Sequence, residues 1–168
     1  MGKVIVITSG KGGTGKTSLT GGLGAALAQC GCRVLCLDAD VGLRNLDITL
    51  GMADAALMDF TDVIAGRCPL DRAVAPHPGI DGLYLLTAPL SLPEDFSGTE
   101  GFRGLLEQAR AVYDWVLWTH RRVLDMGSDW RYPVQTGQSW WRTVTQPLFG
   151  TPSGWWKSWK GSPPFILW

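Results

Sequence analysis

The sequence predicts an α/β fold in which a parallel sheet is flanked by helices and is incomplete after residue 117. Three observations lead to this prediction. Short β-branched runs alternate with segments of helical character over residues 1–117, which is typical of βαβ units and a parallel sheet. A glycine-rich loop joins the first of these runs to the first helical segment. The composition then changes abruptly, so residues 1–117 and 118–168 are taken separately.

Length and composition already exclude several classes of protein. A chain of 168 residues fits one domain, and its formal net charge of zero argues against a nucleic-acid binder that works by bulk charge. No apolar run approaches the roughly 18 residues that a membrane span requires, and the N-terminal run is too short for a signal peptide. Four cysteines do not make a disulfide framework in a chain of this length. We therefore expect a cytoplasmic protein.

The strongest local signal is a phosphate-binding loop. Lys3–Thr8 is a β-branched run typical of a buried strand, and residues 10–17 (GKGGTGKT) after it fit the pattern G-x-x-x-x-G-K-[ST]. Glycines let backbone N–H groups turn onto phosphate oxygens, Lys16 would reach the β- and γ-phosphates, and the Thr17 hydroxyl would hold Mg²⁺. A helix is expected from near Lys16 to about Gln29, with an apolar stripe made by Leu19, Leu23, Ala26 and Leu27. The pattern predicts a P-loop NTPase-like sheet, against the plainer interpretation of an ordinary glycine turn.

Two carboxylates follow the second predicted strand. Arg33–Leu37 has the character of a buried strand and delivers Asp38 and Asp40 at its carboxyl end, where ligands bind in open α/β sheets. Beside a phosphate loop, one carboxylate would lie near the Mg²⁺ shell and the other near an attacking water. The alternative is a solvated loop at the end of a strand.

The remaining elements up to residue 117 are helices at Leu57–Ala65 and Glu100–Ala111 and strands at Leu83–Thr87 and Asp114–Leu117. The cysteines at positions 30, 32 and 36 lack both a Cys-x-x-Cys pair and a nearby histidine. We therefore interpret them as buried free thiols and expect no metal site there.

These residues resemble a known family. The run 9–17 (SGKGGTGKT), with its additional Lys11, is similar to the deviant Walker A motif of the MinD/ParA ATPases. The stretch 38–47 (DADVGLRNLD), followed by Leu50-Gly51-Met52, favours the MinD branch over ParA-type or flagellar-number ATPases. An iron–sulfur carrier ATPase fits less well because Cys-x-x-Cys is absent. The resemblance covers residues 1–117.

The resemblance implies a role for each matched residue, with ATP and Mg²⁺ as cofactors. Thr17 would ligate Mg²⁺ with Asp38 in its outer shell, and Asp40 would orient the hydrolytic water. Lys11 would act in trans across an ATP-bound homodimer, which ties hydrolysis to association. The catalytic residues would be Lys11, Lys16 and Asp40. The nucleotide would be bound by Gly10, Lys11, Gly12, Gly13, Thr14, Gly15, Lys16, Thr17 and Ser18.

The same resemblance implies partners and a location. MinC- or MinE-like regulators, an ATP-dependent homodimer and a membrane surface belong to the family, whereas direct nucleic-acid binding is not expected. Two family features are missing from this sequence. The second switch, Asp-x-Pro-Ala-Gly, should follow Leu117 but is replaced by residues 118–122 (WTHRR). The amphipathic membrane-targeting helix is also absent, because Ser162–Trp168 is not a basic amphipathic segment.

Residues 118–168 have a different composition. They hold eight of the nine tryptophans and no Ala, Cys, Glu or Asn, and the formal charge changes from −4 before residue 118 to +4 after it. Basic and aromatic residues together suit a segment that binds a membrane or nucleic acid, which would make the chain an adaptor. However, the tryptophans follow neither a helical nor an alternating period. This argues against a selected binding surface.

We interpret this tail as a frameshifted translation, poorly ordered and without a selected function. If codons are rebuilt from the third base of one residue and the first two of the next, Trp118-Thr119 gives Asp without any alternative. The following junctions permit Ala, Pro, Ala and Gly, which restores the missing switch directly after Leu117. Further on, Met126-Gly127 gives Gly and Asp129-Trp130 gives Leu without alternatives.

The sequence thus favours two functional hypotheses over the adaptor hypothesis. The first is an enzyme, an ATPase that dimerises on Mg-ATP and hydrolyses it to position the division septum. The second is a truncated nucleotide-binding fragment with little or no turnover. The intact Lys11, Lys16, Asp38 and Asp40 favour the first, and the missing switch favours the second.

Overall fold

The computed structural model describes residues 2–8, 13–53, 55, 58–94, 96, 98–120 and 141–145. Of the predicted site residues, Gly10, Lys11 and Gly12 lie outside this part of the chain, as does most of the tail. In the described residues no helix is long and apolar enough to cross a membrane.

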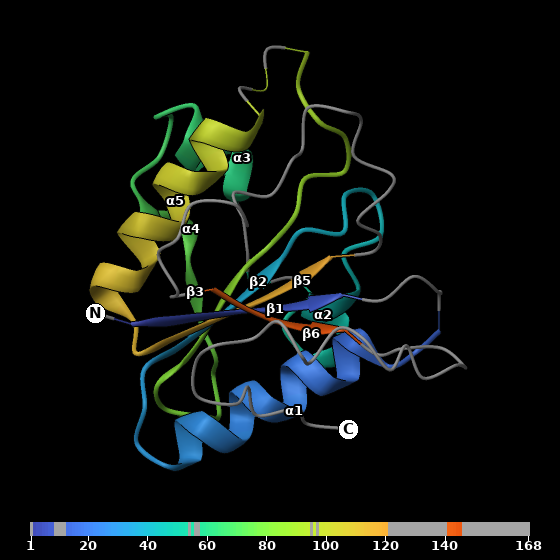
Figure 1. The fold of residues 1–168 in the computed structure, drawn as a ribbon, viewed down its shortest axis with the longest axis vertical. Helices are drawn as coiled ribbons and strands as arrows, with labels where there is room; N and C mark the ends of the chain where they lie inside the picture. Colours follow the sequence, from blue (N-terminus) through green and yellow to red (C-terminus); the bar gives the residue numbers. More distant parts are fainter. Residues whose placement is uncertain are drawn as a thin grey trace, which may run out of the picture.

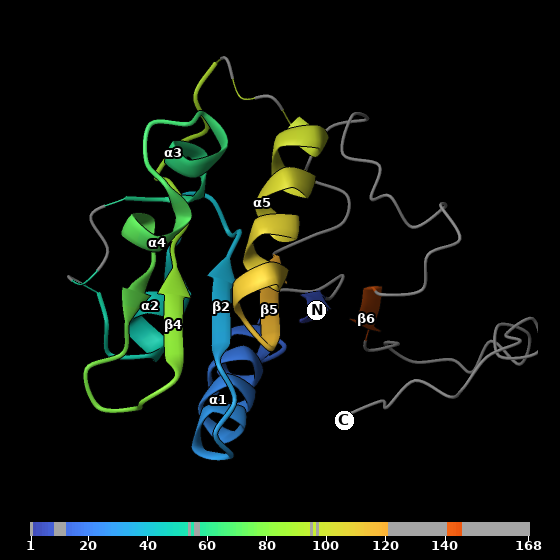
Figure 2. The ribbon, with the colours of Figure 1, turned by 90° about the vertical axis from the view of Figure 1, so that its left-hand side faces the viewer.

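The described strands form one sheet with the order β3-β4-β2-β5-β1-β6. Neighbouring strands are parallel except for β3 and β4, and Figure 2 shows them side by side from β4 to β6. Their bounds are β1 Lys3–Thr8, β2 Val34–Asp38, β3 Ala75–Pro76, β4 Leu83–Leu86, β5 Trp115–His120 and β6 Trp141–Thr145. The predicted parallel sheet is confirmed, and the strands predicted at 3–8, 33–37 and 83–87 are in place to within one residue.

Helices cover both faces of this sheet. Figure 1 shows α1 and α2 on one side and α3, α4 and α5 on the other. Their bounds are α1 Lys16–Gln29, α2 Asn45–Thr49, α3 Phe60–Ile64, α4 Leu70–Ala73 and α5 Gly98–Val112. The helix predicted over 16–29 is confirmed, and the helix predicted over 100–111 is α5, which begins two residues earlier.

Covered faces explain the continuous apolar runs of the central strands. Along β2, Val34 and Cys36 belong to the core on the α1 side, whereas Leu35 and Leu37 belong to the core on the α5 side. All five residues of β2 are buried, because successive side chains point to opposite faces and both faces are packed.

The inward side of α1 differs from the predicted stripe. Ala26 is exposed, Leu19, Leu23 and Leu27 are half-buried, and the buried line is made by Thr20, Gly21, Gly24 and Ala28. A Cβ at Gly24 would lie 2.5 Å from the Cys36 sulfur, so the helix approaches β2 more closely than any side chain would allow. Close approach of small residues, rather than an apolar stripe, therefore seats the helix.

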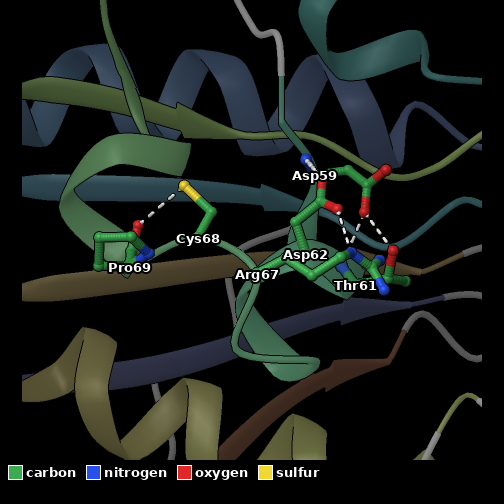
Figure 3. A network of polar contacts seen from close by, with 6 residues as sticks. All are labelled: Asp59, Thr61, Asp62, Arg67, Cys68 and Pro69. Atoms are coloured by element: carbon green, nitrogen blue, oxygen red, sulfur yellow. Dashed lines mark hydrogen bonds and ion pairs between the residues drawn. The ribbon is translucent and has the colours of Figure 1, made fainter.

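The helix predicted at 57–65 is shorter than expected. It begins after Asp59, whose side chain accepts hydrogen bonds from the N–H and the hydroxyl of Thr61. Asp62 reaches back to the N–H of Asp59 at 3.1 Å and also accepts from Arg67 Nε at 2.8 Å (Figure 3). This reciprocal capping box fixes the helix start at Phe60, three residues later than the sequence predicts.

The sheet also continues past the composition break at residue 117. β5 runs to His120, and Trp118 is buried with its ring centroid 4.5 Å from that of Phe102 in α5. Residues 141–145, in the middle of the tail, pair with β1 as the parallel strand β6. The sequence analysis predicted a strand at Asp114–Leu117, but neither its extension to His120 nor β6. Trp118 belongs to the buried core on the α5 side, and residues 141–145 of β6 are rich in β-branched and aromatic residues.

Candidate functional site

The loop between β1 and α1 has the backbone geometry that a phosphate site requires. Gly13 and Gly15 adopt φ of 72° and 80°, in the left-handed region, and both positions face open space. Gly15 is the N-cap of α1 and brings no side chain to cap the first turn, which also carries no acidic residue. The positive end of the helix dipole is thus not compensated by a carboxylate in the first turn, which suits an anion.

The carboxyl ends of the parallel strands place the other site residues at the same edge of the sheet. Asp38 at the end of β2 is in register with Thr119 of β5, and Thr119 is in register with Ile7 of β1. The N–H of Ala39 donates to the Thr119 carbonyl at 2.9 Å, which extends this contact beyond the strands. The ends of β2 and β1 therefore lie on opposite sides of β5.

Asp38 is a buried carboxylate with 1% exposure and two backbone hydrogen bonds. Its Oδ1 accepts from the N–H of Asp40 at 2.9 Å, and its Oδ2 accepts from the N–H of Leu46 at 3.1 Å. Its pKa is raised to about 6, chiefly by burial and also by the charges of Asp40 and Asp47, while the hydrogen bonds from the two N–H groups oppose this rise. Asp38 thereby ties the loop after β2 to the strand.

Asp40 is half-buried and belongs to a tight turn. Its N–H donates to Asp38, and its carbonyl accepts from the N–H groups of Leu43 at 3.2 Å and Arg44 at 3.5 Å. The structure therefore ties the main chain of Asp40 to the Asp38 carboxylate. Lys16 and Thr17 stand, half-buried, in the first turn of α1.

Two further charged residues were not singled out from the sequence. Arg44 Nε lies 3.3 Å from Asp47 Oδ2, an ion pair without hydrogen-bond alignment, and the Asp47 side chain is only 5% exposed. The Asp47 Oδ1 also accepts the N–H of Ile48 at 2.7 Å. The three-residue spacing of Arg44 and Asp47 was a readable signal, but only the fold shows that this pair is next to Asp38 and Asp40.

The cysteines are free thiols, as interpreted from the sequence, although only Cys36 and Cys68 are buried and Cys30 is exposed. Burial raises the pKa of Cys36 to about 12, so its thiol stays protonated. In the described part of the chain no group of three or more His, Cys, Asp or Glu side chains is arranged to hold a metal ion.

Comparison with known proteins agrees with this geometry. Residues 5–124 match the family model described as the CobQ/CobB/MinD/ParA nucleotide binding domain. The septum site-determining protein MinD of Synechocystis is 41% identical over 117 residues, which are 70% of this chain and 44% of that protein. The chain thus spans less than half the length of this curated relative.

Solved structures show the same likeness. MinD in the MinC:MinD cell division protein complex of Aquifex aeolicus is 38% identical, with a TM-score of 0.60 over 74% of this chain and 50% of that one. MinD of Pyrococcus horikoshii complexed with Mg-ADP is 30% identical, with a TM-score of 0.58 over 70% and 48%. With its parallel sheet, its phosphate loop and the match over residues 5–124, the chain belongs to the CobQ/CobB/MinD/ParA nucleotide-binding family.

Proposed function

We propose that this chain binds Mg-ATP and is the nucleotide-binding part of a MinD-type ATPase that dimerises, hydrolyses ATP and positions the division septum. The observation that carries the proposal is the left-handed Gly13 and Gly15 loop, which opens α1 at the sheet edge that also carries Asp38 and Asp40. The Mg-ADP bound to the P. horikoshii relative supports the choice of nucleotide and cation.

The proposed role of each site residue follows from its chemistry. Lys16 and the loop N–H groups neutralise and orient the phosphates. The Thr17 hydroxyl ligates Mg²⁺, and Asp38 holds the outer shell; hydroxyl and carboxylate oxygens are the hard donors that this cation prefers. Mg²⁺ held there would supply positive charge to offset the negative charge of the phosphates. Asp40 orients the attacking water.

Association would complete the site. Lys11 would reach the phosphates of a second copy and supply a cation only in the dimer. A MinC-like regulator is the partner that the A. aeolicus complex supports, and membrane association would be peripheral.

A second candidate function is a nucleotide-binding fragment with little turnover. It is favoured because Thr119, which has no carboxylate, occupies the position where the restored frame would place Asp, in register with Asp38. We propose that residues 118–168 are an out-of-frame translation of a gene for a complete MinD-type protein. The Asp that the shifted frame gives without any alternative at Trp118-Thr119 supports this proposal.

Two measurements test these proposals. Steady-state ATP hydrolysis by the full chain, with Lys16→Ala as the control, should show Mg²⁺-dependent turnover that the control lacks. Turnover equal in both would refute the ATPase, and binding without turnover would select the fragment. Sequencing the gene across the codons for residues 116–119 and beyond residue 168 should show a single-base insertion or deletion relative to close relatives. An intact frame would refute the frameshift.

A further inference from the structure

The orientation of Asp40 depends on the turn that contains it. Its N–H donates to Asp38 Oδ1 at 2.9 Å, and its carbonyl accepts from the N–H groups of Leu43 and Arg44. The main chain of Asp40 is therefore held on both sides, on one side by a strand end and on the other by the turn itself. A change in the turn would move Asp40 even if Asp38 stayed in place.

The turn ends in an unfavourable backbone conformation. Arg44 has φ of 44° and is the only non-glycine residue with positive φ in the described part of the chain. In the left-handed region Cβ crowds the neighbouring carbonyl oxygen, so a long side chain enters it only where other contacts hold it. The position is also the N-cap of α2, and its side chain makes no capping hydrogen bond.

The Arg44 side chain forms an ion pair with Asp47. Arg44 Nε lies 3.3 Å from Asp47 Oδ2, and the Asp47 side chain is 5% exposed against 27% for Arg44. Asp47 is fixed in α2, where its Oδ1 accepts the N–H of Ile48 at 2.7 Å. A buried, anchored carboxylate thus attracts a cation whose own main chain closes the Asp40 turn.

We infer that Arg44 and Asp47 are positioning residues: their ion pair holds the 40–44 turn in the conformation that presents Asp40 to the phosphate site. The importance of this for hydrolysis rests on the function proposed for Asp40. The geometric part, that the pair holds the turn, stands independently. The two parts therefore have separate tests.

The geometric part is tested by residue-resolved amide hydrogen exchange on the full chain. In Asp47→Asn and in Arg44→Asn, the amides of residues 43 and 44 should exchange about tenfold faster or more, because they donate to the Asp40 carbonyl. Asn adopts left-handed φ readily, so Arg44→Asn removes the cation without adding backbone strain. The α5 amides of Leu105 and Leu106 should be unchanged.

A matched control breaks a similar ion pair elsewhere. Arg67 Nε lies 2.8 Å from Asp62 Oδ1 beside α3, and Arg67→Gln should leave exchange in the 40–44 turn unchanged. Unchanged exchange in the Asp47 and Arg44 variants would overturn the inference. A uniform rise throughout the chain would also overturn it, because that result describes general destabilisation.

The catalytic part is tested by steady-state ATP hydrolysis. Misplacement of Asp40 should lower kcat about tenfold in each Asn variant, while the KM for Mg-ATP stays within about twofold, since the phosphate loop is untouched. Arg44→Lys, which keeps the cation, should recover most of kcat, and the double Asn variant should be no slower than either single variant. Faster exchange with unchanged kcat would overturn the positioning role. If the parent chain has no turnover, the proposed ATPase function fails, and the exchange result alone decides the inference.

Discussion

On one face of the sheet α1 meets β2 through glycine and alanine, whereas on the other face α3 and α5 meet the strands through aromatic rings. Gly24 makes the first contact, against Cys36. In the second, the Phe102 ring centroid lies 5.6 Å from that of Phe60 and 4.5 Å from that of Trp118. This difference predicts on which face a larger side chain, and on which face a smaller one, should lower stability most. On the α1 face an added side-chain atom at Gly24 would clash with β2. On the α5 face the removal of an aromatic ring would leave a cavity.

The largest expected effect is loss of volume on the α5 face. Phe102 is 3% exposed, and Phe102→Ala would leave a cavity between two aromatic rings. We expect the free energy of unfolding to fall by about 3–5 kcal/mol, measured by urea denaturation. Phe102→Leu retains most of the volume and should cost clearly less. Equal losses for the two variants would show that this face does not depend on filled space.

The next effect is a pH dependence from Asp38 at the site end of the sheet. Burial raises the pKa of Asp38 from 3.8 to about 6, so the folded chain binds this proton more tightly than the unfolded chain. The resulting stabilisation is fully present below about pH 4 and is lost as the pH rises through about 6. The rise in the pKa of Asp38 corresponds to a stabilisation of about 3 kcal/mol.

The comparison variant for this prediction is Asp38→Asn. Urea denaturation of both proteins between about pH 4 and pH 7 should show the parent losing stability relative to the variant as the pH rises. Parallel curves would mean that Asp38 is not held in a buried, proton-retaining environment.

A larger side chain on the α1 face should lower stability by less, and only at positions that touch the sheet. A Cβ at Gly24 would meet the Cys36 sulfur at 2.5 Å and Leu83 Cδ1 at 3.2 Å, so Gly24→Ala should destabilise the chain by about 1–3 kcal/mol. In a Cys36→Ala background the cost should shrink, because the nearest atom is gone. Gly22 in the same helix faces open space, and Gly22→Ala should stabilise by roughly 0.5–1 kcal/mol. Equal effects at Gly22 and Gly24 would contradict the close approach.

The smallest predicted effect concerns the start of α3. Asp59 caps this helix, and Asp59→Ala should lower the free energy of unfolding by about 1 kcal/mol. Asp81 is an exposed acid in a turn, and Asp81→Ala should change stability by less than about 0.5 kcal/mol. A thermal melt of the two variants beside the parent checks the difference. Indistinguishable melts would mean that the cap seen in Figure 3 adds nothing measurable.

The sequence predicts the strands and the phosphate loop because their signals are local. A β-branched run and an eight-residue pattern need no knowledge of the neighbours, and β1 and α1 lie where these signals place them. The inward side of α1 was not predictable in this way, since Gly24 faces β2 through a missing side chain that hydrophobic periodicity does not register.

In the candidate site, too, residues with a local sequence signal were predicted, and those that depend on the fold were not. Asp38 and Asp40 were predicted from the position of the second strand, and in the structure the Asp40 N–H donates to the Asp38 carboxylate. The Arg44–Asp47 pair was not predicted, because it depends on a positive φ at Arg44 and on the burial of α2. β6 was not predicted, because the tryptophans of residues 118–168 follow no regular period, and its pairing with β1 is seen only in the fold.

The central claim is that residues 13–18 bind nucleotide phosphates at the carboxyl edge of this sheet. Isothermal titration of the full chain with Mg-ADP, beside Lys16→Ala, tests it most directly. We predict saturable binding of one nucleotide per chain, weakened about tenfold or more in the variant because a charge-assisted contact to phosphate is lost. Circular dichroism should show the same fold for both proteins. Absence of binding to the parent, or equal affinity in the two, would contradict the account.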